Sequence, residues 1–570
     1  MKMNMIRQSQ IGEPARERRS FGAPTRQSDG AQDTEASAEA AIVVGGSRFG
    51  KDRVVNAGDL LGQDASDQTG HPAGVRAAIV AQANRGKSED GTTVTTERSR
   101  VTTGGVKGGR KANPQSDGDR EANSPRVPPD ADKQGEEDLW QRYGAERGVW
   151  NERMLMALER GIKGNKWFSL IDKVGRLDVL ELAWEKVQSN AGACGVDGIT
   201  VERFDKDSPE RLLAVKEHLE GGSYQPKPVK RVWIPKPGSP EKRPLGIPTV
   251  RDRVVQCALR MVVEPIFERD FASQSYGFRP GRSCHDALRR VDELLQSGHW
   301  HVVDIDIKGY FDAIPQERLM ERVGERIADG RVLGLIEAFL KAGVMEGRER
   351  WDAETGTPQG GVLSPLLANI YLDPLDWLME RAGLEMVRYA DDMIVLCREP
   401  QSAMRALEAI QRWMGEAGLE LNGEKTRLID MSGTGSHFDF LGYRFWRGQS
   451  GRVRRFVRPK SRKKLRERIK PLTRRVNGRS LEAIIAVINP ILRGWYGYFK
   501  HVSADGLREI DGWVRGRVRA ILRQRHGGQG RARGKDHHRW GNSYFVQLGL
   551  FCLERARAEE IISLRGGVTC

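Results

Sequence analysis

A chain of 570 residues has room for roughly two to four domains. Its 93 Lys and Arg outweigh 77 Asp and Glu, and the resulting net charge of +16 favours a polyanionic partner, nucleic acid before membrane. No apolar run is long enough to span a membrane, no signal peptide is visible, and the six cysteines lack disulfide or zinc-ligand spacing, which predicts a cytosolic protein with reduced thiols.

The first 135 residues differ from the rest of the chain. They contain only two aromatic residues, Phe21 and Phe49, and are rich in Gly, Ser, Thr and charge. Such a segment cannot bury enough apolar surface to offset its ordering entropy, so we predict a disordered tail over 1–135. Glu13 and Glu17 argue against a transit peptide. A reading frame extended upstream of the true start is the alternative explanation of this composition.

Helices and a basic hairpin are expected next. Apolar residues at helical spacing predict helices over 150–158 and 179–187. Two short strands around a Pro/Gly-rich turn predict a hairpin over 232–248, with Lys236 and Arg243 at its base. Cations there suit a triphosphate, because charge builds on phosphate oxygens as the bond breaks. Two solvated charges on a loop are the alternative.

A helix over 251–267 leads into a connector rich in Gly, Pro and Arg, which contains Arg279 and Arg282. Arginine can grip a phosphate bidentately, so this connector is a candidate nucleic-acid contact. Ser283 is a plausible N-cap for the helix that follows. We expect the lone His285 to be a structural hydrogen-bonding residue.

Two carboxylate-bearing segments form the centre of the sequence. In the predicted strand 301–307, alternation places Asp304 and Asp306 on one face, and the spacing does not decide between them. About 80 residues later, a predicted hairpin carries Asp391 and Asp392 at its tip. Adjacent buried carboxylates repel each other, and a divalent cation removes that penalty. A solvated Asp-Asp turn is the alternative for an isolated pair.

Two further motifs and a basic block complete the pattern. A Gly-rich turn at 356–365, containing Gln359, precedes a predicted helix, and Lys425 lies in a short motif at 419–426. Residues 451–570 carry a net charge of +20, whereas the preceding 450 residues carry −4. Such a concentrated block is typical of a surface that tracks phosphates. Four of its cations recur at helical spacing: Arg462, Lys463, Arg466 and Lys470.

A helix over 481–492 is predicted within this block, followed by aromatic residues interleaved with cations from Arg493 onward. A basic helix over 515–525, a Gly/Arg stretch that looks disordered, and the aromatic residues Trp540 and Phe545 come last.

As an ordered set, these motifs resemble the reverse transcriptases encoded by group II introns, which are also maturases, and the resemblance covers about 138–562. It implies an α+β right-hand polymerase with an antiparallel palm sheet, fingers ahead of it and a helical thumb behind it. The domains expected are a disordered extension (1–135), fingers and palm (136–450), a thumb or maturase domain (451–505) and a basic C-terminal nucleic-acid-binding segment (506–570). The segment 440–445 resembles the strand that grips the primer end.

The resemblance also assigns roles to residues. It resolves the choice between the two strand aspartates in favour of Asp306. The implied catalytic residues are Asp306, Asp391 and Asp392. Two Mg²⁺ ions would be ligated by Asp306, Asp391 and the backbone carbonyl of Ile307. The implied dNTP contacts are Lys236, Arg243, Ile307, Phe311, Gln359 and Lys425, where Phe311 would select against a ribose 2′-OH and Lys425 would act as general acid. The implied nucleic-acid contacts are Arg279, Arg282, Arg462, Lys463, Arg466, Lys470 and Arg493.

The function implied is RNA-dependent DNA synthesis, together with binding of group II intron RNA to assist splicing and support intron mobility. The expected partners are the intron RNA, an RNA template with a DNA primer, target DNA and dNTPs, and the expected location is the bacterial cytoplasm rather than an organelle. No intrinsic endonuclease is predicted, because His537 and His538 lack partner ligands. The alternatives are a splicing-only maturase with a dormant polymerase and a domesticated host reverse transcriptase.

Overall fold

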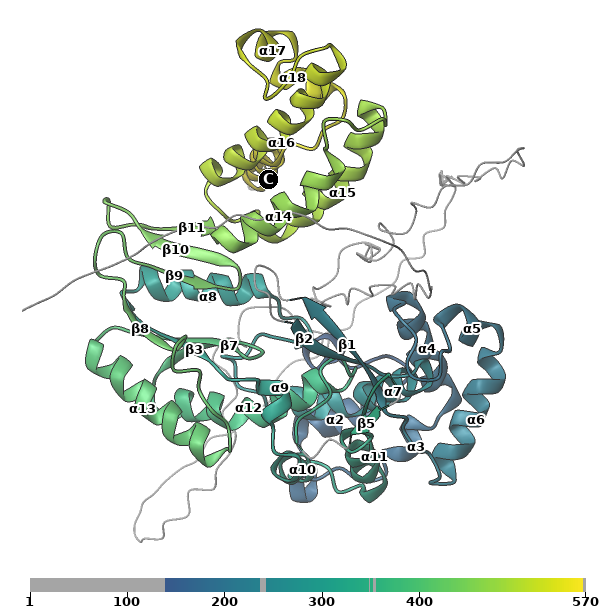
Figure 1. Ribbon diagram of the computed structural model, residues 1–570. Helices are drawn as coiled ribbons and strands as arrows, with labels where there is room; N and C mark the ends of the chain where they lie inside the picture. The colour runs from purple at the N-terminus through teal and green to yellow at the C-terminus, as the bar shows by residue number, and fades with distance from the viewer. Residues whose placement is uncertain (1–138, 236–241, 348, 352–354, 567–570) are drawn as a thin grey trace, which may run out of the picture. The chain divides into compact units, whose positions relative to one another are not determined.

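The computed structural model describes residues 139–566, apart from 236–241, 348 and 352–354 (Figure 1). The predicted tail over 1–135 and Lys236 therefore lie outside the described residues. No helix in the described part of the chain is both long and apolar enough to cross a bilayer.

The N-terminal part is helical around α7 (Val250–Glu268), whose residues are buried on nearly all sides. The buried residues include the polar Asp252, Glu264 and Glu268 as well as apolar ones, and α7 packs against α4 and α3. The helices predicted over 150–158, 179–187 and 251–267 are confirmed. The helices that precede α7 are α1 (Leu139–Arg142), α2 (Glu152–Arg160), α3 (Ile171–Val174), α4 (Leu177–Asn190), α5 (Val201–Lys206) and α6 (Ser208–Glu220).

The predicted basic hairpin is present as the antiparallel pair β1 (Val229–Pro235) and β2 (Lys242–Ile247), in which Ile234 faces Arg243. Two short strands extend it into a sheet with the order β2-β1-β4-β5: these are β4 (Val344–Glu346) and β5 (Glu349–Trp351). Three helices directly precede β4 in the chain: α9 (Tyr310–Ala313), α10 (Gln316–Gly324) and α11 (Gly330–Leu340).

The central sheet has the order β6-β7-β3-β8, and every pair in it is antiparallel. Its strands are β3 (His301–Asp306), β6 (Glu385–Tyr389), β7 (Asp392–Cys397) and β8 (Arg427–Asp430). Helix α8 (Cys284–Gln296) covers one face, whereas α12 (Ser364–Arg381) and α13 (Pro400–Glu416) cover the other (Figure 1). The antiparallel sheet with helices confirms the α+β fold class.

Alternation along the strands divides this sheet between two hydrophobic cores. Val303 and Ile305 pack into the core of α12 and α13, while Val302 packs with α8. Because side chains alternate with a period of two, Asp304 and Asp306 lie on the same face as Val302. This agrees with the prediction that the two aspartates share one face.

A third sheet, of order β11-β10-β9, follows. Its strands are β9 (His437–Phe440), β10 (Tyr443–Arg447) and β11 (Val453–Val457). The prediction of a single strand over 440–445 is wrong, because the chain reverses at Leu441 and Gly442, whose φ values are 48° and 79°. Two successive left-handed residues are typical of a tight hairpin turn. The pairing of β11 with β10 also carries this sheet across the proposed domain boundary at 450.

The C-terminal region is helical, and its helices share one core with α8 and the third sheet. Its helices are α14 (Pro459–Leu472), α15 (Leu481–Phe499), α16 (Ala504–Arg525), α17 (Gly534–Arg539), α18 (Asn542–Gln547) and α19 (Leu553–Gly566). Helix α15 extends seven residues beyond the predicted end at 492. The Gly/Arg stretch expected to be disordered is an ordered loop, since Gly528 N donates to Arg523 O (2.9 Å) and Arg523 Nε donates to Gln529 O (2.8 Å).

The connector between α7 and α8 corrects one prediction. Ser283 caps α8 in a capping box with Asp286, as expected. Arg279, predicted to contact nucleic acid, is instead buried: its side chain is 3% exposed and binds Glu268 through Nε and Nη2, with Nη2 2.7 Å from Oε1. Its Nη1 donates to the backbone oxygens of Ala272 and Ser275. All three nitrogen atoms of the Arg279 guanidinium thus donate to groups within the protein. Arg282, by contrast, is only partly buried.

We expect Arg279→Ala to destabilise the protein by about 3–5 kcal/mol, because Glu268 would remain buried without its counter-charge. Arg282→Ala, the matched control three residues away, should cost less, because Arg282 donates to the backbone oxygens of Ser273 and Ser275 and its loss leaves no buried carboxylate without its ion-pair partner. Urea denaturation of both variants measures the difference. Equal stability of the two variants would show that the buried pair does not hold the connector.

Candidate active site

The register of the central sheet brings the predicted carboxylates together. Asp306, the last residue of β3, faces Asp392, the first residue of β7, and Asp391 precedes Asp392 at the hairpin tip. Directly opposed residues in an antiparallel pair have Cβ atoms about 5 Å apart. Asp304, by contrast, is bound by Arg427, with Nη2 2.8 Å from Oδ2. Arg427 therefore holds Asp304, whereas Asp306 lies at the strand end, opposite Asp392.

Negative charge is crowded at this tip. The surrounding protein raises the pKa of Asp391 by desolvation, and the charge of Asp306 raises it further. Desolvation, followed by the charges of Asp391 and Asp304, raises the pKa of Asp392 to about 7, although the backbone N–H of Leu441 donates to its carboxylate and opposes the shift. Asp391 and Asp392 both remain exposed to solvent. A cation can therefore reach them, even though the protein around them makes ionisation costly.

Lys425 supplies a counter-charge within this site. Its Nζ lies 3.0 Å from Asp306 Oδ2, and both side chains are substantially exposed. The motif at 419–426 is fixed beside β3, since Lys308 N donates to Glu420 O and Asn422 N donates to Asp306 O. Lys425 therefore lies beside the aspartates as an ion-pair partner of Asp306.

The residues present fit a hard divalent cation. Mg²⁺ prefers one or two carboxylates combined with substrate phosphates, and Asp306 and Asp391 offer accessible oxygens in a crowded negative field. Within the described residues, no three metal-ligating side chains converge on one point. A cation held here would therefore draw its remaining ligands from backbone, water or a bound phosphate.

A buried ion pair fixes the hairpin tip. Arg388 is fully buried and binds Asp376 of α12 through both Nε and Nη2, with Nε 2.7 Å from Oδ1. Its Nη1 donates to Asn369 Oδ1 (2.9 Å) and to Ala390 O (3.0 Å). Ala390 adopts φ 59°, a left-handed conformation that non-glycine residues rarely take. The guanidinium therefore anchors the residue that precedes Asp391.

Sequence reasoning missed this pair. The available signals were an arginine within an otherwise apolar strand and an aspartate on the apolar helix 364–381, since a charge in either place requires a partner.

Gly277 was likewise assigned only to a basic connector. A Cβ at Gly277 would lie 2.2 Å from Ala390 N, so the connector can approach the hairpin tip only with glycine here.

Three of the predicted nucleotide contacts come from segments that are joined by backbone hydrogen bonds. Thr357 N donates to Phe311 O (2.7 Å), and Gly246 N donates to Gln359 O (2.7 Å). The Gly-rich loop is therefore tied both to α9, which carries Phe311, and to β2, which carries Arg243. Gly360 permits this approach, because a Cβ on it would lie 2.3 Å from Gly246 O.

The remaining predicted residues lie elsewhere. Lys236 is outside the described residues, and Arg279 is buried in the connector. Arg462, Lys463, Arg466 and Lys470 lie on α14, while Arg493 lies on α15 and its guanidinium is 5.4 Å from the centre of the Phe551 ring.

Comparison with known proteins agrees with this geometry. Residues 234–445 match the family described as reverse transcriptase (RNA-dependent DNA polymerase), so the chain carries a reverse transcriptase domain. Residues 462–540 match the maturase-specific domain of group II introns. The chain belongs to the family of group II intron-encoded reverse transcriptases with a maturase domain.

Individual relatives are similar over part of their length. The chain is 40% identical over 219 residues to the group II intron-encoded protein LtrA of Lactococcus lactis subsp. cremoris, covering 38% of this chain and 36% of that protein. It is 35% identical over 296 residues to protein YkfC of Escherichia coli K12, covering 45% of this chain and 76% of that protein. A chain of the partial Cas6-RT-Cas1–Cas2 complex is 22% identical with a TM-score of 0.29, covering 45% of this chain and 43% of that one.

The buried pair predicts different outcomes for two carboxylates three residues apart on α12. Asp376→Asn should destabilise the protein by about 3–5 kcal/mol, because Arg388 would be left buried and uncompensated. Asp373→Asn should cost little at pH 8, because burial raises the pKa of Asp373 to about 7 and its charge is already unfavourable. Urea denaturation compares the two. A more destabilising Asp373→Asn would contradict this assignment.

Asp392 predicts a pH-dependent stability in buffer without divalent cations. Its pKa is about 7 in the folded protein against an ordinary value of 3.8. The folded state therefore holds the proton more tightly, and the contribution of Asp392 to stability is lost as the pH rises from about 4 through 7. Asp392→Asn should raise Tm at pH 8, and the gain should shrink towards pH 4. A constant gain across this range would refute the shifted pKa.

Proposed function

We propose that this chain is the RNA-dependent DNA polymerase of a group II intron and that it also binds the intron RNA, assists its splicing and supports intron mobility. The observation that carries the proposal is the meeting of Asp306 and Asp391, which come from distant segments, at one end of the central sheet. Carboxylates from two strands are the arrangement that polymerases use for in-line phosphoryl transfer.

The proposed reaction is attack of a primer 3′-OH on the α-phosphate of a dNTP, with release of pyrophosphate. Asp306, Asp391 and the backbone carbonyl of Ile307 would hold two Mg²⁺ ions, with Asp392 as the neighbouring carboxylate. When bound, the ions would neutralise charge on the attacking and leaving oxygens. The Arg388–Asp376 pair keeps Asp391 in place on a rigid tip, so that little reorganisation accompanies the reaction.

The nucleotide would lie against the segments tied together by the Gly-rich loop. Arg243 and Lys236 offer positive charge to the triphosphate, and Gln359 offers an amide to the nucleotide. Phe311 is half-buried and packs edge-on against Tyr310, with ring centres 5.5 Å apart. A ring held in this way would select against a ribose 2′-OH. Lys425, which now pairs with Asp306, would donate a proton to the leaving pyrophosphate.

Different segments of the chain are proposed to bind different nucleic acids. Residues 136–450 would bind template, primer and dNTP, while 451–505 and 506–570 would bind intron RNA and target DNA. Arg282 and Arg493 remain proposed nucleic-acid contacts, since Arg282 is partly accessible and Arg493 is exposed. Arg462 and Arg466 are available only in part, because both pair with Glu509.

The main alternative is a splicing-only maturase whose polymerase is dormant. The crowded carboxylates argue against it, because an arrangement that makes ionisation costly has no structural benefit without a cation. A domesticated host reverse transcriptase is a further alternative, and intron RNA structure in the flanking DNA would distinguish it.

Primer extension on poly(rA)/oligo(dT) tests the proposal. We expect Asp391→Ala and Asp306→Asn to reduce dNTP incorporation by at least about 1,000-fold, because several kcal/mol of charge stabilisation are lost. Asp304→Asn, on the same face of the same strand, should retain activity within about tenfold. Wild-type activity in Asp391→Ala would refute the site. Normal splicing by an inactive Asp391→Ala would show that RNA folding and DNA synthesis are separable.

A further inference from the structure

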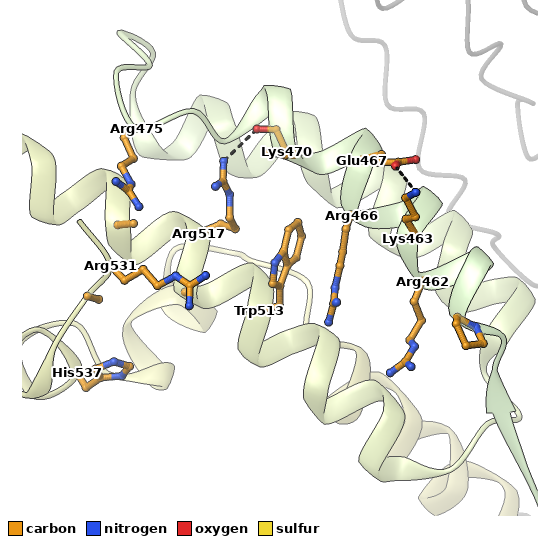
Figure 2. A pocket seen from close by; sticks show the side chains of 14 residues that line it. Arg462, Lys463, Arg466, Glu467, Lys470, Arg475, Trp513, Arg517, Arg531 and His537 are labelled. Atoms are coloured by element: carbon orange, nitrogen blue, oxygen red, sulfur yellow. Dashed lines mark hydrogen bonds and ion pairs between the residues drawn. The ribbon is translucent and has the colours of Figure 1, made fainter. Parts of the chain in front are cut away.

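A cleft with a volume of about 740 Å³ lies between α14 and α16, with α17 and the loop before it at one side (Figure 2). It is distinct from the aspartate site in both sequence and composition. Seven arginine or lysine side chains line it, against a single carboxylate, Glu467. Lys463 is 3.8 Å from that carboxylate and compensates it.

Polar contacts join α14 and α16 at both ends of the cleft. At one end, Glu509 of α16 binds Arg462 (2.6 Å) and Arg466 (2.8 Å) of α14. At the other end, Arg517 of α16 donates to Lys470 O (3.1 Å) and to the hydroxyl and backbone oxygens of Thr473 (3.0 and 2.6 Å). These directional bonds bridge the two helices at both ends of the cleft, above the apolar core that α14 and α16 share.

An aromatic side chain stands in this space. Figure 2 shows the indole of Trp513 between Arg466 and Arg517, in the middle of the cleft. The Arg466 guanidinium lies 5.7 Å from its ring centre. The lining beside it is made of small residues, Gly516 and Ala520, and a Cβ on Gly516 would meet nothing within 4 Å. There is therefore room for a flat group next to the indole.

The positive charge of the cleft is not balanced by the protein. The side chains of Lys470, Arg475 and Arg531 make no hydrogen bond or ion pair within the part of the chain that the structure describes. Desolvation and the nearby charge of Arg475 lower the pKa of Arg517. Like charges gathered around a hollow favour an anionic ligand, because such a ligand relieves their mutual repulsion.

We propose that this cleft binds an unpaired nucleotide of a single-stranded RNA segment, with its base stacked on Trp513 and its flanking phosphates on Lys470, Arg475 and Arg531. An aromatic surface within a rim of free cations is the chemistry that recognises unstacked bases in RNA. A base pair inside a duplex does not expose the face that such stacking needs. The inference rests on the proposed RNA-binding function and gives that function a specific site.

Gly516 provides a test that does not endanger the fold. A Cβ on Gly516 would meet no protein atom within 4 Å, so Gly516→Leu extends a side chain from the lining of the cleft, and leucine favours a helix more than glycine does. Gly512→Leu is the matched control: it lies on the same helix, it is exposed, a Cβ there also meets nothing within 4 Å, and it does not line the cleft.

The full-length protein would be irradiated with a 12-mer oligouridylate containing 5-iodouridine, and the crosslinked peptides would be mapped. We expect a crosslink at Trp513 in wild type and in Gly512→Leu, and its loss in Gly516→Leu. The yield of the Trp513 crosslink in Gly516→Leu should fall by about fivefold or more relative to wild type, the lower range for one stacked base. Unlabelled oligouridylate should suppress the crosslink in wild type and in Gly512→Leu alike. A blunt 12-base-pair RNA duplex should not compete.

No crosslink at Trp513 in wild type, an undiminished crosslink in Gly516→Leu, or equal competition by the duplex would each overturn the inference. Primer extension by the same preparations separates it from the proposed function. Active polymerase without the crosslink would reject the cleft alone, while a crosslink in a chain that never extends a primer would reject the polymerase alone.

Discussion

The buried ion pair between Arg388 and Asp376 is the interaction on which the geometry of the candidate active site depends. Either charge alone would be very costly in this interior, so the pair is maintained as a unit with Asn369 as a neutral third partner. Arg388 Nη1 also donates a hydrogen bond to Ala390 O. This bond stabilises the left-handed backbone of Ala390 directly before Asp391. Carboxylates that repel each other can be held at close range only on a support as rigid as this one.

The fold and the centre of the site were predictable because their signals are local. The alternation around Asp304 and Asp306, the hairpin at Asp391 and the Ser283 cap each depend on a few neighbouring residues. Arg279 was misassigned because an arginine in a Gly/Pro-rich connector looks exposed, whereas Glu268 of the preceding helix buries it. The role of Arg388 was missed for the same reason: burial is decided by partners that sequence spacing does not reveal.

The two hydrophobic cores explain why domain boundaries were difficult to place from the sequence. The central sheet contributes Val303 and Ile305 to one core and Val302 to the other. The second core continues through the third sheet into the C-terminal helices. A change in charge composition near 450 is real at the surface, but the apolar packing beneath it is continuous across that position.

The ion pair of Lys425 with Asp306 has a consequence for the resting state of the protein. The ammonium group of Lys425 takes the place of an external cation and relieves part of the repulsion between the carboxylates. In the proposed mechanism, a divalent ion that binds Asp306 would displace this ammonium group, so occupancy of the site would be a competition rather than simple filling. The displaced Lys425 would then lie free next to the proposed triphosphate site, which would couple ion entry to the arrival of the proposed proton donor.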